Sequence, residues 1–218
     1  MTERHIAVLA RVQTRGEELA NSLSHGLGLG LAIAAIPVMV VLASRGGGAL
    51  EVAALSIFGA SMVLCYGSST LYHALPEGTG KRIAQALDHA AIFLLIAGTY
   101  TPFTLAVIGG AWGWSLFGVV WGLALVGMVL KFAAPRFYRR ISTAVYLGMG
   151  WLVIIALRPM WLALSGEAIG WLAAGGLFYT AGVAFYVSDH KPYHHFVWHL
   201  FVLGGTVCHV VALMSCLA

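Results

Sequence analysis

The sequence has little charge. Only 9% of its 218 residues are Asp, Glu, Lys or Arg, while 60% are apolar. A soluble domain carries about a quarter charged residues, so the scarcity of charge excludes a water-facing globular surface. We therefore expect an integral membrane protein. It should be all-α, because helices satisfy their backbone hydrogen bonds within lipid. The net charge of +4 is no evidence for binding to nucleic acid, because basic residues in such a chain set its orientation in the membrane. We expect no nucleic-acid partner.

Cysteine and lysine are also scarce. The three cysteines, Cys65, Cys208 and Cys216, lie in apolar stretches without paired spacing, which argues against a disulfide framework or a CxxC metal site. The three lysines lie at the ends of apolar runs. A retinal-binding photoreceptor needs a lysine midway through its last helix, so that class is excluded.

Long apolar runs dominate the rest. A helix needs roughly 20 apolar residues to cross a bilayer, and seven runs qualify, at about 20–43, 51–73, 84–108, 112–131, 141–158, 168–187 and 194–217. The fifth is expected to stop at Arg158-Pro159. Residues 1–19 are predicted to be a cytoplasmic tail. The stretch 4–20 is expected to form either a short amphipathic helix at the membrane interface or a solvated chain. Residues 20–218 form the seven-helix domain. Two glycine pairs, Gly26 with Gly30 and Gly118 with Gly122, have the small-xxx-small spacing of close helix packing.

Lys and Arg predict the orientation. Seven spans place the N-terminal tail on one side with the second, fourth and sixth connections, and this set holds ten of the twelve basic residues. The other set holds only Arg45 and Arg158. Basic residues accumulate on the cytoplasmic side. We therefore expect a multi-pass protein of the cell (inner) membrane with a cytoplasmic N-terminus and an external C-terminus.

Polar residues from four spans share one depth near the predicted cytoplasmic face. They are Glu18, Asn21 and His25 in the first span, His73 in the second, Asp88 and His89 in the third, and His195 and His199 in the seventh. His195 and His199 are one helical turn apart, so their imidazoles face the same way. Ser69 lies one turn deeper than His73 on the same face. Three neutral imidazoles plus a water make the open arrangement of catalytic zinc, with Asp88 as a nearby carboxylate.

Simpler interpretations stay open for several of these residues. HxxxH spacing alone has many accidental matches. Three interpretations are open for His25 and His89: further metal ligands, neighbours that orient the metal ligands, or packing residues. The last two are preferred. Glu17 and Glu18 also fit solvated charges ahead of a helix. A haem between His73 and His195 is not excluded.

Three segments carry a family resemblance: SSTLYH at 68–73, DHAAIFLLIAGTYTPF at 88–103 and HHFVWH at 194–199. Together they resemble the signature regions of the progestin and adipoQ receptor superfamily, and EELANSLSHG at 17–26 resembles its bacterial haemolysin III branch. The resemblance implies zinc bound by His73, His195 and His199, with Asp88 holding the zinc-bound water and Ser69 as the serine of the SxxxH motif. The chain lacks the sizeable N-terminal domain of the receptor branch, so hormone binding is not implied.

The resemblance further implies a zinc-dependent hydrolase with ceramidase-like activity on a lipid amide. Zinc lowers the pKa of a bound water to about 7; Asp88 would take its proton and return it to the leaving amine, and Ser69 would donate to the oxyanion. Two alternatives remain: a cytolytic, membrane-perturbing protein, and a non-catalytic membrane sensor with structural zinc. The partners expected are the bilayer and a lipid-like substrate; the oligomeric state is undetermined.

Overall fold

The computed structural model describes residues 11–217, except for the side chains of residues 139 and 140. This part of the chain is almost entirely helical and contains no strand. Seven helical segments are long and apolar enough to cross a membrane, which confirms the predicted all-α fold with seven spans. The elements are α1 (Arg15–Gly46), α2 (Ala49–Ala74), α3 (Thr79–Pro102) with the π-helical η1 (Phe103–Ile108), α4 (Gly110–Ala133), α5 (Pro135–Gly150) with the 3-10 segment η2 (Trp151–Ala156), α6 (Leu157–Ala163), α7 (Gly166–Tyr186) and α8 (His194–Leu217).

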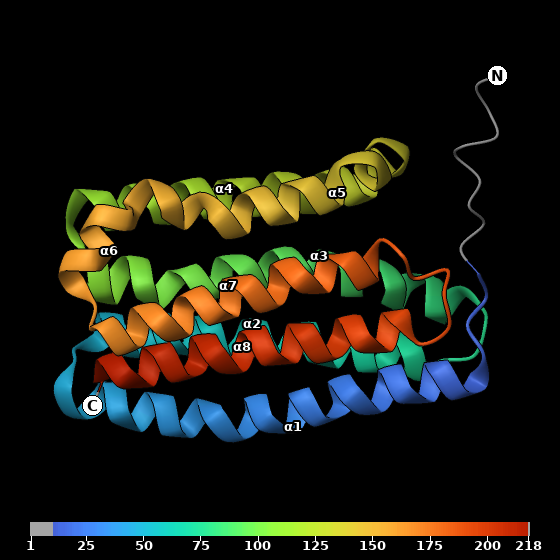
Figure 1. Ribbon diagram of the computed structural model, residues 1–218, viewed down its shortest axis with the longest axis horizontal. Coiled ribbons are helices and arrows are strands. Elements are labelled where there is room, and N and C mark those ends of the chain that lie inside the picture. The colour runs from blue at the N-terminus through green and yellow to red at the C-terminus, as the bar shows by residue number, and fades with distance from the viewer. Residues whose placement is uncertain (1–10, 218) are drawn as a thin grey trace.

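The long helices run side by side in one bundle (Figure 1). α1, α2 and α8 pack together, α7 lies along α8, and α3 lies between α2 and α4. α4 and α5 form an outer layer, and α5 has few contacts with α7. A helix of 24 residues is about 36 Å long, enough to cross a hydrocarbon core of about 30 Å.

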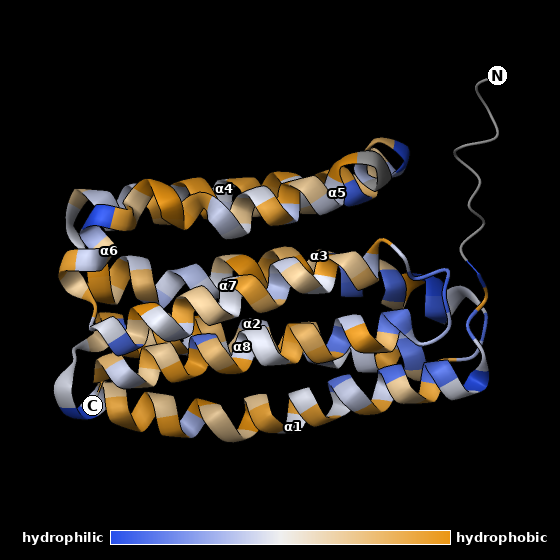
Figure 2. Ribbon diagram, viewed as in Figure 1, coloured by the Kyte–Doolittle hydropathy of each residue, from blue (hydrophilic) through white to orange (hydrophobic). Residues whose placement is uncertain are grey.

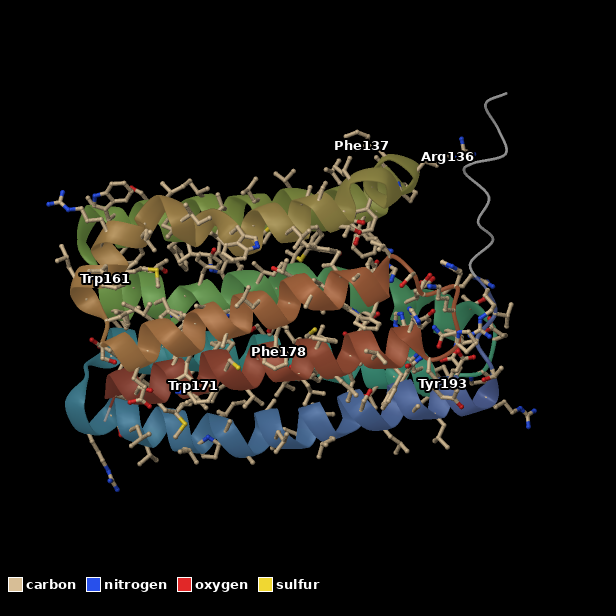
Figure 3. The ribbon with its side chains drawn as sticks, viewed as in Figure 1. Arg136, Phe137, Trp161, Trp171, Phe178 and Tyr193 are labelled. Carbon is tan, nitrogen blue, oxygen red and sulfur yellow. The ribbon has the colours of Figure 1, made fainter. Side chains whose placement is uncertain are left out.

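The two ends of the bundle differ in polarity. At one end α1, α3 and α8 begin and α2 finishes, and we call this the histidine end. Hydrophilic residues gather there on α1 and α8, while the middle of the helices is largely hydrophobic (Figure 2). Tyr193 marks the histidine end, and Trp161 and Trp171 lie toward the opposite end (Figure 3). Which end faces the cytoplasm stays a prediction.

α1 begins earlier than the sequence analysis predicts, at Arg15 instead of residue 20. The reason is a capping box. The hydroxyl of Thr14 accepts a hydrogen bond from the Glu17 backbone N–H (3.3 Å), and the Glu17 carboxylate accepts one from the Thr14 N–H (2.9 Å). Residues 11–14 are not helical. The rest of the predicted interfacial helix lies outside the described residues.

The prediction that the fifth span ends at Arg158-Pro159 is wrong. After α5 the chain continues through η2 and α6 to Ala163. Ala156, before α6, leaves the helical conformation (φ −100°, ψ 18°), so Pro159 falls in the first turn of a new helix. Proline is tolerated there because N–H groups of a first turn have no acceptor within the helix.

The break between α5 and η2 is stabilised by a side chain of α3. The hydroxyl of Tyr100 donates to the carbonyl oxygen of Gly150 (2.8 Å) and accepts from the N–H of Val153 (2.9 Å). These backbone groups would otherwise be unpaired inside the membrane, which costs free energy. Tyr100 therefore fixes α5 and η2 against α3.

Close helix packing occurs only partly at the predicted glycines. A Cβ atom on Gly26 would make an ordinary contact with Thr70 of α2 at 3.7 Å, whereas one on Gly30 would meet nothing within 4 Å. A Cβ atom on Gly118 or Gly122 would have no heavy atom within 4 Å, so the small-xxx-small interpretation of this pair is wrong within the monomer. A Cβ on Gly127 would instead lie 2.3 Å from the ring of Phe93. α3 and α4 therefore approach closely through Gly127.

Candidate metal centre

Three histidines meet at the histidine end. His73 lies in the last turn of α2, and His195 and His199 lie in the first two turns of α8. A ring nitrogen of each lies within 4.8 Å of the other two, and the group could hold a metal ion. The ring centroids of His195 and His199 are 4.7 Å apart, and both lie 5.1 Å from that of His73. His73 is 4% exposed and His199 2%.

Glu18 of α1 orients His73. The Nδ1 atom of His73 lies 2.7 Å from Oε2 of Glu18, so Nδ1–H donates to the carboxylate and leaves Nε2 with its lone pair. The other oxygen of Glu18 accepts from Nζ of the buried Lys81 on α3 at 2.8 Å. A carboxylate behind a ligating imidazole is the usual way in which proteins fix its tautomer and direction.

α1 also orients His199. Its Nδ1 lies 3.3 Å from the carbonyl oxygen of Asn21 and 3.2 Å from the hydroxyl of Ser24. The Ser24 hydroxyl itself donates to the same carbonyl at 2.8 Å. Nδ1–H of His199 therefore has its acceptor on α1, and Nε2 remains available. The amide of Asn21 also lies 3.5 Å from Nδ1 of His73.

Glu17 has a role that the sequence analysis missed. It is not a solvated charge: it is 3% exposed, and its carboxylate accepts from the backbone N–H of Tyr193 at 2.8 Å. Tyr193 has a positive φ of 60° and immediately precedes α8 (Figure 3). Arg11 pairs with the same carboxylate. Glu17 thus attaches the start of α8, which carries two of the histidines, to α1.

The chemistry of the cluster fits a metal site. Nε2 of His73 and Nδ1 of His195 are buried and have no hydrogen-bond partner in the described part of the chain. An unpartnered buried nitrogen costs about 1–3 kcal/mol, and two of them side by side are rare in a packed interior. A cation would satisfy both. The residues therefore fit a metal, and three neutral imidazoles suit several transition metals.

The remaining predicted residues lie at the same end. Asp88, 8% exposed, and Ser69, 1% exposed, are buried, and the Ser69 hydroxyl lies beside the Asp88 carboxylate. His25 stacks on His199 with ring centroids 3.6 Å apart. His89 faces another partner: its Nδ1 lies 2.7 Å from Nζ of Lys131 on α4.

A cavity of about 300 Å³ begins at this cluster. Asp88, Ser69, His195 and His199 line its polar end, and Met160 lines it toward the opposite end. Most of its wall is apolar and comes from α3, α5, α7 and α8. The outer wall includes α5 and α7, whose mutual contacts are few. The arrangement is a polar, metal-compatible group at the end of an apolar chamber.

Comparison with known proteins identifies the chain. A family model described as "Haemolysin-III related" matches residues 13–210, which is most of the sequence and includes every residue of the cluster. The chain belongs to the haemolysin III family. It is a multi-pass protein of the cell membrane.

Relatives extend this placement. This haemolysin III protein is 45% identical over 190 residues to the Hemolysin-3 homolog of Bacillus subtilis (strain 168), covering 87% of this chain and 89% of that one. It is 42% identical over 190 residues to Hemolysin-3 of Bacillus cereus, covering 87% of each. The human Monocyte to macrophage differentiation factor is 26% identical over 163 residues, 72% of this chain and 67% of the human protein. Such distant relatives fit the wider progestin and adipoQ receptor superfamily.

Proposed function

We propose that this haemolysin III protein is a zinc-dependent hydrolase that cleaves the amide bond of a membrane lipid. The observation that carries the proposal is the pairing of buried, unpartnered imidazole nitrogens with an apolar cavity that begins at them. A cluster that served only to join helices would need no chamber beside it.

The donor set favours zinc among the metals. Three histidine ligands with room for a water are typical of catalytic zinc, whereas structural zinc sites usually have four protein ligands, commonly including cysteine. Cys65 is the cysteine among the cavity-lining residues, and it is not one of the three clustered ligands. The carboxylate of Glu18 behind His73 supports the same assignment.

The cavity favours a lipid substrate. Its wall beyond the histidines is mostly apolar and rich in Leu, Ile and Val, which match an acyl chain. The bundle spans the membrane, so a lipid reaches such a chamber without crossing water. The weakly packed α5–α7 side is the route we propose for its entry.

The residues at the polar end have complementary tasks in amide hydrolysis. Bound zinc would supply a Lewis acid and an activated water. Asp88 accepts a proton from the attacking water and passes it to the leaving nitrogen, so that a carboxylic acid and an amine are released. The hydroxyl of Ser69, which lies beside the Asp88 carboxylate, donates a hydrogen bond to the carbonyl oxygen as negative charge develops there. The apolar wall holds the acyl chain and excludes bulk water.

The distribution of Lys and Arg puts the histidine end on the cytoplasmic side. Under this orientation the reaction takes place near the inner leaflet, and the cavity extends toward the outer leaflet.

The test uses purified protein in detergent and in lipid nanodiscs. We expect one zinc per chain by elemental mass spectrometry, lost in His195→Ala/His199→Ala, and release of fatty acid from a ceramide or another N-acyl lipid. Asp88→Asn should keep zinc and lose about 10²–10⁴-fold in rate, the usual contribution of a general base. Asp189→Asn, in the loop before α8, is the matched control and should retain both.

Two outcomes would replace the proposal. Zinc without hydrolysis of any N-acyl lipid would favour a structural zinc in a membrane sensor. Leakage of dye-loaded vesicles that is insensitive to Asp88→Asn would favour a membrane-perturbing role, in keeping with the name of the Bacillus cereus relative.

A further inference from the structure

Far from the histidine cluster, the cavity contains a polar group that has no hydrogen-bond partner among the residues that the structure describes. Five of the hydroxyls along its wall are bonded internally. Four of them donate to backbone carbonyl oxygens: Thr99 to Leu95 (2.7 Å), Tyr100 to Gly150 (2.8 Å), Thr104 to Tyr100 (2.9 Å) and Thr180 to Gly176 (2.7 Å). The fifth, on Tyr179, is paired with the hydroxyl of Thr206 (2.7 Å). His209 also lines the cavity, and its Nδ1 is buried without a partner.

The imidazole of His209 is held in one orientation by α7. A Cβ atom on Gly175 would lie 2.3 Å from Cδ2 and 2.4 Å from Nε2 of His209, so the ring occupies the space that only glycine leaves. The ring donates to the carbonyl of Leu172, one turn before Gly175, and the ring of Tyr179 lies 5.5 Å away. Since Nε2 is on the edge that faces α7, Nδ1 of the neutral ring is a hydrogen-bond acceptor.

An unpaired acceptor inside a membrane protein costs free energy that a bound group can recover. A single water is a poor candidate, because buried waters typically make about three hydrogen bonds, and the neighbouring hydroxyls are already paired. A hydroxyl carried on a lipid chain needs only the one acceptor, because the rest of the chain is held by the apolar wall.

The position of His209 sets where on the chain that hydroxyl must be. His209 lies ten residues beyond His199 on α8, which is about 15 Å along the helix axis. A lipid whose polar head lies at the histidine cluster would therefore reach His209 with the middle of its acyl chain.

We propose that His209 recognises a hydroxyl group in the middle of an acyl chain, so that the cavity prefers mid-chain hydroxylated lipids over plain ones. The inference rests on the proposed function, since it requires that the cavity hold an acyl lipid. Nδ1 of His209 accepts a hydrogen bond from the hydroxyl, while Gly175 and Leu172 keep the ring from turning away.

The test is a binding comparison in nanodiscs. Stearic acid, 12-hydroxystearic acid and 2-hydroxystearic acid compete with a fluorescent long-chain fatty acid for the purified protein. We expect 12-hydroxystearic acid to bind about five- to tenfold more tightly than stearic acid, the effect of one recovered buried hydrogen bond. The 2-hydroxy isomer, with its hydroxyl at the wrong depth, should show no such gain at His209.

His209→Phe keeps a ring but removes the acceptor, and it should bind stearic acid normally with no preference for the 12-hydroxy acid. His209→Asn places an oxygen near the position of Nδ1 and should restore part of the preference. Thr99→Val, which removes a hydroxyl already bonded to its own helix, is the matched control and should keep the full preference. Metal content and stearic acid binding report whether each variant is folded.

Equal binding of stearic and 12-hydroxystearic acids by the unmodified protein would overturn the inference while leaving a lipid hydrolase intact. A preference that survives in His209→Phe would overturn it as well. If the unmodified protein bound none of the three acids, the lipid cavity of the proposed function would be wrong and this inference with it.

Discussion

Glu18 of α1 contacts both α2 and α3. The substitution Glu18→Gln tests how this residue affects the histidine cluster. Its two carboxylate oxygens lie 2.7 Å from Nδ1 of His73 and 2.8 Å from Nζ of Lys81. Glutamine keeps the length of the side chain and one oxygen acceptor but removes the negative charge. The substitution therefore removes the negative charge behind His73 without opening a cavity.

The expected loss follows from those distances. Both are in the range of charge-assisted hydrogen bonds, which are roughly twice as strong as neutral ones. Removal of such a partner from a ligating histidine typically costs 10–100-fold in metal affinity. Because glutamine can still accept from Nδ1–H, we expect a loss of about tenfold, or about 1.4 kcal/mol. Lys81, 7% exposed, would keep only the carbonyls of Tyr72 and Leu75, so the protein should also melt at a lower temperature.

The assay is a zinc titration of the apo-protein in detergent against a competing fluorescent chelator, with thermal melting recorded in parallel for apo- and metal-loaded protein. Glu51→Gln is the matched control, because the Glu51 carboxylate also accepts a hydrogen bond, from the N–H of Gly48 at the other end of the bundle. A Glu18→Gln protein that folds and binds zinc as tightly as the Glu51→Gln control would refute the role assigned to Glu18.

Four further substitutions, one of them a control, test the fold by thermal melting. Gly127→Ala forces a Cβ to 2.3 Å from Phe93 and should lower the free energy of unfolding by about 1–3 kcal/mol. Gly122→Ala, whose Cβ meets nothing within 4 Å, is the control and should be neutral or slightly stabilising. Equal stability of the two variants would contradict the packing described. Tyr100→Phe removes the hydroxyl at the break between α5 and η2 and should cost about 1–3 kcal/mol, so an unchanged melting temperature would mean that the break does not need it. Ser165→Ala removes the cap of α7, which accepts from the N–H of Ala168 at 3.1 Å, and should cost about 1 kcal/mol; no loss would show that another group caps this helix.

The spans could be predicted from the sequence because membrane insertion depends on a simple quantity, the length of an apolar run. Where the prediction failed, local chemistry decided. Thr14 and Glu17 carry the capping-box spacing, which starts α1 at Arg15, and this signal was present in the sequence. Pro159 looked like a stop, but a proline can begin a helix as well as end one.

The candidate cluster could be predicted because its members share two readable properties, helical spacing and depth in the membrane. The role of Glu17 could not, because its bond to the N–H of Tyr193 joins residues 176 positions apart. The cavity also left no pattern in the sequence. It exists where helices fail to pack, so its walls carry the same apolar residues as a filled core.

The distribution of the three histidines along the chain has a consequence for the order in which the protein is made. His73 is on α2, while His195 and His199 are on α8, the last helix of the described chain. A nascent chain that has inserted six spans therefore offers one imidazole and no site. The three nitrogens come together only after α8 has entered the membrane and Glu17 has bonded to its start. A metal held by this cluster would accordingly load last in assembly, and its presence would mark a bundle whose seven spans are all in place.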